Sequence, residues 1–283
     1  MAGARGEYTL ASSGAERARL ARQAERIRPA TERLFRSAEI GPGARVLDVG
    51  SGAGDVALVV AELVGEAGSL VGIDRDQAQL DTAARRCAEA GRANVRFEVG
   101  DLHDPPAGPF DAIVGRFVLM YQPDPGAAIR TLATRLAPGG SMAFLELALP
   151  LGADTSGALS WPEHRLVAAI RSWISAAFSA TGVAPLMGLR LRGTFQAAGL
   201  EPQDPLEGFA IVYAGREAAE MVAGLVRSML PVIIEHHIAT AAEIDIDTLA
   251  DRLVDAAEGE ELIYSLPLAI AAWARKPESV TAT

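Results

Sequence analysis

The stretch VLDVGSGAGD at residues 46–55 decides the fold of this chain. Residues 45–49 form a short, apolar, β-branched run, which is typical of a buried parallel strand. Glycines then alternate at positions 50, 52 and 54, and residues 56–64 carry a helical pattern that ends at Gly65. Glycine adopts φ > 0 readily and lets a ligand approach the backbone. We therefore expect a ligand beyond the carboxyl end of this strand.

The glycine spacing bears on which ligand binds. A dinucleotide fingerprint has the spacing G-x-G-x-x-G, and its third glycine packs the helix against the strand. Gly50 and Gly52 fit that pattern, but its third position holds Asp55. Asp48 precedes Gly50, and an acid at a strand end repels a pyrophosphate but suits a cationic ligand. This combination resembles motif I of the class I S-adenosylmethionine (SAM)-dependent methyltransferases, whose ligand carries an amino group and a sulfonium.

Acids after the next two predicted strands extend the resemblance. A strand predicted at residues 69–73 ends in Asp74, where an acid can accept both hydroxyls of a ribose. That role does not choose between SAM and a nicotinamide dinucleotide. A third strand, predicted at residues 95–99, is followed by Gly100, Asp101 and Leu102. In the resembled family a carboxylate at this place accepts the adenine exocyclic amine, and the next backbone N–H bonds a ring nitrogen.

The resemblance implies two sets of site residues. A fourth strand is predicted at residues 110–114, and the family places an aromatic or cationic residue after it, beside cofactor and substrate. The cofactor-binding set is Asp48, Gly50, Ser51, Gly52, Gly54, Asp74, Arg75, Gly100, Asp101, Leu102, Arg116 and Phe117. The candidates for the substrate site are Tyr8, Tyr121, Trp161 and Trp173.

The order of predicted elements gives the fold class. Strands and helices alternate through residue 149, which predicts a doubly wound, mostly parallel α/β sheet. Further strands at residues 209–213 and 262–273 would complete a seven-stranded, Rossmann-like methyltransferase sheet. A helical cap is expected after strand five and between strands six and seven, because such caps cover substrate pockets and exclude water.

The expected organisation follows from these elements. Pro29 is predicted to break or kink the first helix, and amphipathic helices are predicted at residues 161–180 and 216–237, the second broken at Pro231. The expected segments are N-terminal lid helices (1–40), a SAM-binding core (41–149), cap helices (150–188), a core return with a helix and strand six (189–215), cap helices (216–258), strand seven (259–276) and a tail (277–283).

Composition excludes several function classes. Acidic residues outnumber basic ones 36 to 26, the net charge is −10, and no basic block occurs, so we expect no nucleic-acid partner. Lys276 is the only lysine and Cys87 the only cysteine, which argues against Schiff-base chemistry, an internal disulfide and a thiolate metal site. We expect no metal, no membrane span and no signal peptide, hence a cytoplasmic protein. A homodimer stays open.

Methyl transfer from a sulfonium is an in-line displacement, so the protein must mainly align the reactants and exclude water. A general base helps when the acceptor is a hydroxyl or an acidic carbon, and His236, His237 and Glu146 are the candidates. The apolar cap predicts a small, largely apolar metabolite as acceptor, with O-, N- and C-methylation unresolved. Two alternatives remain: a nicotinamide-dependent oxidoreductase, which Asp55 disfavours, and a SAM-binding protein that does not methylate, such as a cyclase or ligand-binding module.

Overall fold

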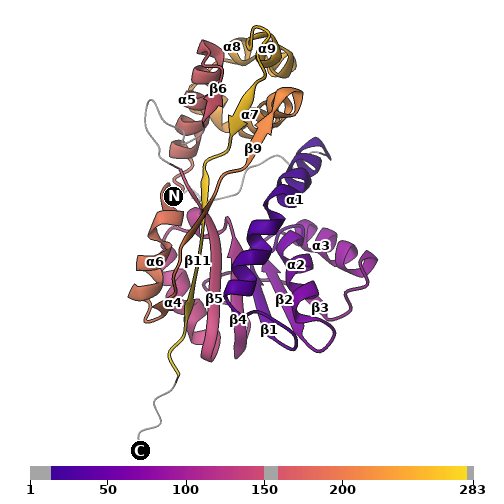
Figure 1. Cartoon of the computed structure of the whole chain (residues 1–283), viewed down its shortest axis with the longest axis vertical. Helices are drawn as coiled ribbons and strands as arrows, with labels where there is room; N and C mark the ends of the chain where they lie inside the picture. Colours follow the sequence, from indigo (N-terminus) through magenta and orange to yellow (C-terminus); the bar gives the residue numbers. More distant parts are fainter. Residues whose placement is uncertain (1–13, 150–158, 279–283) are drawn as a thin grey trace, which may run out of the picture. The chain divides into compact units, whose positions relative to one another are not determined.

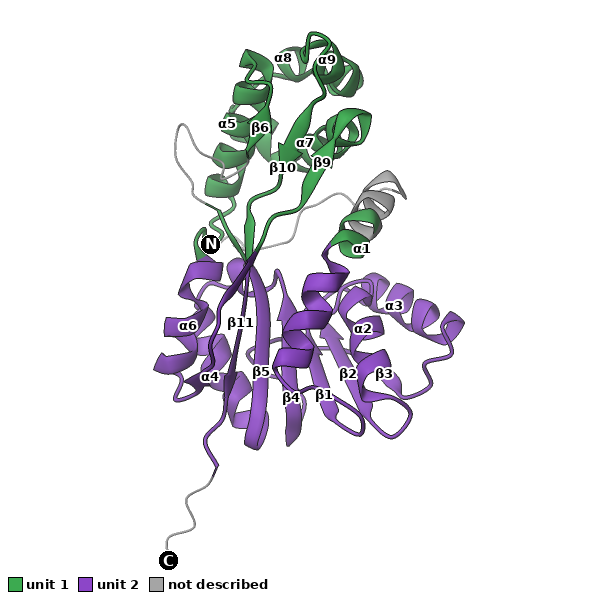
Figure 2. Cartoon of the chain, in the orientation of Figure 1, with its two compact units in different colours: residues 1–26, 147–186, 209–269 green, residues 27–146, 187–208, 270–283 purple. Residues whose placement is uncertain are grey.

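The computed structural model describes residues 14–149 and 159–278, with side chains described from residue 22 onward. The chain divides into two compact units (Figure 2). Unit 1 comprises residues 1–26, 147–186 and 209–269, and unit 2 comprises residues 27–146, 187–208 and 270–283. Within the described part of the chain, no helix is long and apolar enough to cross a membrane.

Unit 2 is built on a doubly wound, mostly parallel sheet, as the sequence predicts. Its strand order is β3-β2-β1-β4-β5-β11-β7, and β8 also pairs with β11. Figure 1 shows the run from β3 to β11. Strands β1 to β5 pair in parallel, whereas β7 runs antiparallel to β11. The strands are β1 (Arg45–Val49), β2 (Ser69–Asp74), β3 (Val95–Val99), β4 (Phe110–Arg116), β5 (Leu136–Ala148), β7 (Glu201–Pro202), β8 (Glu207–Phe209) and β11 (Leu268–Arg275).

The sheet has eight strands in the described residues where seven were predicted. The additional strand is β7, whereas β8 contains Phe209 of the strand predicted at residues 209–213; both pair with β11. The chain order of the strands reverses between β1 and β4. In a doubly wound sheet, ligands bind at such a switch point, outside the carboxyl ends of the strands. The glycine stretch after β1 and Arg116 at the end of β4 therefore lie at the expected place.

Helices with short polar caps accompany these strands. The Asp76 carboxylate accepts the Ala78 amide at 2.8 Å and starts α3, and Asp124 accepts the Ala127 amide at 2.9 Å and starts α4. Pro29 lies inside α1 without ending it, so of the predicted break or kink the break is wrong. The helices and the 3₁₀ turn are α1 (Gly14–Ser37), α2 (Asp55–Val64), α3 (Gln77–Glu89), η1 (Leu119–Tyr121), α4 (Pro125–Arg135) and α6 (Met187–Ala197).

Unit 1 has its own core of helices packed on a small sheet. The sheet is antiparallel with order β6-β10-β9, and Tyr213 and Tyr264 pair across it. Both tyrosines are buried in the same apolar cluster as Ile170, Val222 and Leu253. The elements are β6 (Ser160–Trp161), α5 (Arg165–Ala180), β9 (Val212–Ala214), α7 (Gly215–Glu235), α8 (Ala241–Ile244), α9 (Leu249–Asp255) and β10 (Ile263–Ser265).

Four element predictions for this half of the chain are wrong in detail. The helix predicted to break at Pro231 continues past it, because Pro231 lies inside α7. The helix predicted from Trp161 begins at Arg165. Trp161 belongs to β6 and pairs with Ile263 of β10, and the His164 side chain is the N-cap that accepts the Leu166 amide. The strand predicted at residues 209–213 is divided between β8 and β9. The strand predicted at residues 262–273 is divided at Pro267, which has no N–H to donate to a ladder.

A buried carboxylate holds the loop that follows β4. Glu146, on β5, is fully buried and accepts the amide N–H groups of Val118, Leu119 and Met120 at 2.9, 2.8 and 3.3 Å. Phe117, directly before these amides, adopts φ 56°, a left-handed conformation that is uncommon for a bulky residue. Burial raises the pKa of Glu146 to about 7, and the three amide bonds oppose that shift.

Gly54 and Gly43 form a matched pair for testing the packing of the glycine loop. Both have φ 85°, but a Cβ at Gly54 would lie 2.9 Å from the Cβ of Ala83, whereas a Cβ at Gly43 would meet no atom within 4 Å. Alanine at either position should lose about 1 kcal/mol of stability through backbone strain. Gly54→Ala should lose roughly 1–3 kcal/mol more through overpacking. Denaturant unfolding measures both; equal losses would contradict the close packing of the loop on α3.

The Glu146 clamp should appear in the pH dependence of stability. The folded pKa of about 7 exceeds the ordinary value of 4.5, so the folded state binds more protons between these pH values. The contribution of Glu146 is therefore fully present below pH 4.5 and declines as pH rises through about 7. Relative to Glu146→Gln, the wild type should lose roughly 3 kcal/mol across that window. If the free energies of unfolding of the two proteins differ by the same amount at every pH, Glu146 is not a buried, titrating group.

Candidate active site

The three glycines of the loop differ in what surrounds them. A Cβ at Gly50 would lie 2.5 Å from the Val118 Cγ2, and one at Gly54 would collide with Ala83. Gly52 has φ 49°, and a Cβ there would meet no protein atom within 4 Å. Internal packing therefore explains Gly50 and Gly54, whereas Gly52 presents its backbone to open space, where a ligand can approach it.

Two carboxylates lie at the ends of the adjacent strands β2 and β3. Asp74 accepts the amide of Gly52 at 2.9 Å and the amide of Asp76 at 3.0 Å, so it anchors the glycine loop to β2. Asp101 accepts the His103 amide at 2.8 Å and the Arg75 Nε at 2.6 Å. Burial by itself would raise the pKa of Asp101, but the amide and the guanidinium together hold it below its ordinary value.

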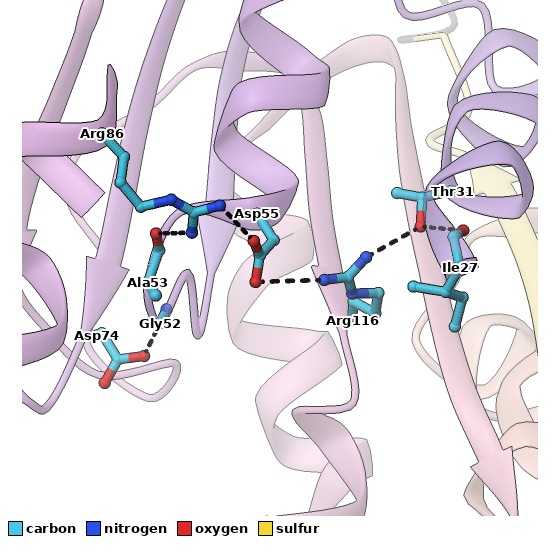
Figure 3. Close-up of polar contacts among 8 residues, drawn as sticks. All are labelled: Ile27, Thr31, Gly52, Ala53, Asp55, Asp74, Arg86 and Arg116. Carbon is cyan, nitrogen blue, oxygen red and sulfur yellow. Dashed lines mark hydrogen bonds and ion pairs between the residues drawn. The ribbon is translucent and has the colours of Figure 1, made fainter. Parts of the chain in front are cut away.

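A chain of polar contacts runs from Arg86 on α3 through Asp55 and Arg116 to Thr31 on α1 and includes the carbonyl of Ala53 in the glycine loop (Figure 3). Arg86 donates to the Ala53 carbonyl at 2.6 Å and to Asp55 Oδ1 at 2.7 Å. The other oxygen of Asp55 lies 3.8 Å from the guanidinium of Arg116, which also donates to Thr31 Oγ1 at 3.3 Å. Asp55 therefore joins two arginines at the start of α2, the position where a dinucleotide fingerprint has its third glycine.

Asp48 is the least satisfied group of the site. It is 0% exposed, and neither carboxylate oxygen has a hydrogen-bond partner in the described structure. Burial raises its pKa well above the ordinary value, Arg116 opposes the shift, and Asp74 and Asp55 add to it. A buried acceptor without a donor is costly, so the site favours a ligand that brings positive charge and N–H donors. The buried hydroxyl of Ser51 also has no partner in the described structure.

The remaining candidates of unit 2 follow the carboxyl ends of β3 and β4. Gly100 lies beside Ile73, and the side chain of Leu102 is buried. Phe117 and Tyr121 are half-buried on the segment that Glu146 holds. The structure thus brings the whole predicted cofactor set to one end of the β3-β2-β1-β4 sheet. Their binding roles stay predictions.

The other predicted residues lie elsewhere. Trp161 is 58% exposed on the small sheet of unit 1, and Trp173 packs against the core of that unit. His236 and His237 are exposed at the end of α7, where His236 is the C-cap and His237 has φ 53°. Tyr8 falls outside the described residues.

Sequence reasoning missed three residues that shape the site, namely Thr31, Arg86 and Val118. Thr31 and Arg86 lie in helices in which nothing marks them as partners of a distant loop. Val118 reads as one of several apolar residues after β4. Only their tertiary contacts with Arg116, Asp55 and Gly50 reveal their part in the site.

Comparison with known proteins identifies the domain. A family model described as "Methyltransferase domain" matches residues 40–174. Nocamycin O-methyltransferase of Saccharothrix syringae is 37% identical over 118 residues, which are 41% of this chain and 42% of that protein. The YcgJ protein of Bacillus subtilis superposes with a TM-score of 0.57 at 20% identity, covering 88% of this chain and 98% of that one. The cyclase SpnF gives a TM-score of 0.54 at 24% identity, covering 89% and 82%.

These similarities concern the domain more than the whole protein. The matches span between 33% and 54% of the length of the first curated relatives. Within the matched segment lie the glycine loop, the acids that end β1 and β2, Asp101 after β3, and Arg116. Together with the parallel strand order and its switch point, the family match shows a methyltransferase domain in residues 40–174 of the chain.

Proposed function

We propose that this protein transfers a methyl group from SAM to a small, largely apolar molecule. The observation that carries the proposal is the fully buried carboxylate of Asp48, which has no partner among the described residues and lies two residues before a glycine turn with open space at Gly52. A nicotinamide dinucleotide would bring a pyrophosphate to this place and add negative charge beside Asp48, Asp55 and Asp74. SAM instead brings an ammonium and a sulfonium, which compensate negative charge.

The residues present fit SAM, each through a separate part of the ligand. The backbone at Gly52 would receive the amino-acid portion, and Asp48 would compensate its ammonium. Asp74 has two oxygens at the carboxyl end of β2, where ribose hydroxyls can donate to them. Asp101 and the amide of Leu102 would receive the adenine edge. Arg75 pairs with Asp101 and keeps that carboxylate ionised as an acceptor.

The chain's own part in the reaction is alignment and exclusion of water. When bound, SAM supplies an already activated methyl group. Glu146 fixes three consecutive amides, and so holds the segment between Phe117 and Tyr121, of which Val118 lies beside Gly50. The clamp uses the Glu146 carboxylate in backbone hydrogen bonds. We therefore assign Glu146 a positioning role rather than that of a general base.

Unit 1 is our candidate for acceptor recognition. Trp161, on β6, and the neighbouring Leu159 are 58% and 75% exposed, which is unusual for such large apolar side chains. An apolar acceptor would gain from contact with them, whereas a charged acceptor would not. His236 and His237 end α7, where a cation is favoured by the helix dipole. A role in capping α7 therefore explains the position of the two histidines, and no role as a general base is needed.

The reaction class can be tested without knowing the acceptor. Mass spectrometry of the purified protein, and calorimetric titration with SAM, S-adenosylhomocysteine and NAD, should show binding of the two sulfur ligands only. Incubation with SAM and a panel of apolar phenols, quinones and carboxylic acids should yield S-adenosylhomocysteine together with a methylated product. Binding of NAD alone would refute the proposal. Tight SAM binding with no methylated product from the panel or from a metabolite extract would favour a non-methylating role. SpnF, which has a similar fold, is described as a [4+2]-cyclase.

Asp74→Ala should weaken binding of S-adenosylhomocysteine by roughly 1.5–3 kcal/mol, because it removes a charged acceptor for the ribose hydroxyls. The control is Asp81→Ala, an exposed acid on the outer part of α3 that should leave affinity unchanged. Calorimetry gives both affinities, and circular dichroism checks the fold. If the two variants bind equally well, Asp74 does not hold the ribose.

A further inference from the structure

The glycine loop encloses more negative than positive charge. Asp48 on β1, Asp74 on β2 and Asp55 on α2 are its carboxylates, and Arg116 on β4 and Arg86 on α3 are its cations. Asp55 already shares both arginines, with Arg86 at 2.7 Å and Arg116 at 3.8 Å. If Asp48, Asp55 and Asp74 were all ionised, the cluster would be one positive charge short. Neutralising one acid, or adding one cation, balances it.

Asp48 is the acid that most favours the neutral form. Asp74 has two backbone amide donors and Asp55 has Arg86, whereas neither oxygen of Asp48 has a donor in the described structure. A buried carboxylate without donors gains the least from ionisation. Arg116 is the cation that opposes protonation of Asp48, but it is itself engaged with Asp55 and Thr31. Cys87, also near Asp48, adds no charge, because burial raises the pKa of its thiol.

We propose that the cofactor-free protein holds Asp48 as the neutral acid, and that the ammonium group of the bound cofactor ionises it. In this step the O–H bond of the carboxyl group breaks and the proton leaves to the solvent, while the ammonium keeps its own protons. The inference rests on the proposed function, because it takes the ligand to be SAM or its product. It makes cofactor affinity dependent on pH through one residue.

The ammonium, rather than the sulfonium, is the group that fits. Both oxygens of Asp48 lack a donor in the described structure, and an ammonium offers three N–H donors, directly or through an ordered water. A sulfonium offers charge but no hydrogen. S-adenosylhomocysteine keeps the ammonium and lacks the sulfonium, and 5′-methylthioadenosine lacks both. Comparison of these two ligands therefore tests the amino-acid portion, which carries the ammonium, with no sulfonium present.

The experiment is calorimetry of the full chain with S-adenosylhomocysteine in two buffers of different ionisation heat. At about pH 6 the free α-amino group of the ligand, with a pKa near 7.7–8.0, is already charged. The apparent enthalpies should then report release of about one proton per bound ligand. Affinity should rise with pH between about 5 and 7, by up to tenfold per unit. 5′-Methylthioadenosine should release none.

Asp48→Asn should bind S-adenosylhomocysteine without proton release and with a flat pH profile, while the control Asp81→Asn should behave as wild type. Binding by the wild type without proton release would overturn the inference and leave the proposed function standing. Equal release by Asp48→Asn, or by 5′-methylthioadenosine, would also overturn it. Failure of the wild type to bind S-adenosylhomocysteine would overturn both. The comparison of the two ligands uses wild-type protein and so does not depend on folding of the variant.

Discussion

The arrangement of this site depends on a buried carboxylate, Asp48, to which none of the described residues donates a hydrogen bond. Asp48 lies near the end of β1, the strand at the switch point, which pairs in parallel with β2 and β4, and its side chain is 0% exposed. Burying an ionised carboxylate without hydrogen-bond donors has a large free-energy cost. The residues around it moderate that cost without removing it. We therefore interpret this unsatisfied group as the chain's part of a cofactor contact.

Two buried carboxylates, Asp48 and Glu146, illustrate different solutions to burial. Glu146 is surrounded by three amide donors and holds the loop after β4. That loop then places Val118 against Gly50, so the conformation of the glycine turn depends on a clamp on β5. Asp48 has no such donors in the described structure. The first group is complete within the protein and stabilises structure, whereas we infer that a ligand completes the second.

The sequence predicts the parallel sheet and the cofactor loop well, because both follow from local patterns. Short β-branched strands, glycines at positions that require φ > 0, and acids at strand ends are visible without tertiary contacts. The second half of the chain is harder. The sequence patterns predict one strand at residues 209–213 and one at residues 262–273. In the structure each range is divided between the large sheet and the small sheet, because the local pattern does not determine which sheet a strand joins. The Arg86–Asp55–Arg116 chain is likewise a tertiary feature, formed by residues 31 to 61 positions apart.

The charge state of Asp48 tests the central claim most directly. Carboxyl-carbon NMR of the ¹³C-labelled protein can report it, with the signal assigned by its loss in Asp48→Asn. We predict the chemical shift of a protonated acid in the cofactor-free protein at about pH 6, and that of an ionised carboxylate after addition of S-adenosylhomocysteine. The same charge state with and without a saturating concentration of the ligand would contradict the claim.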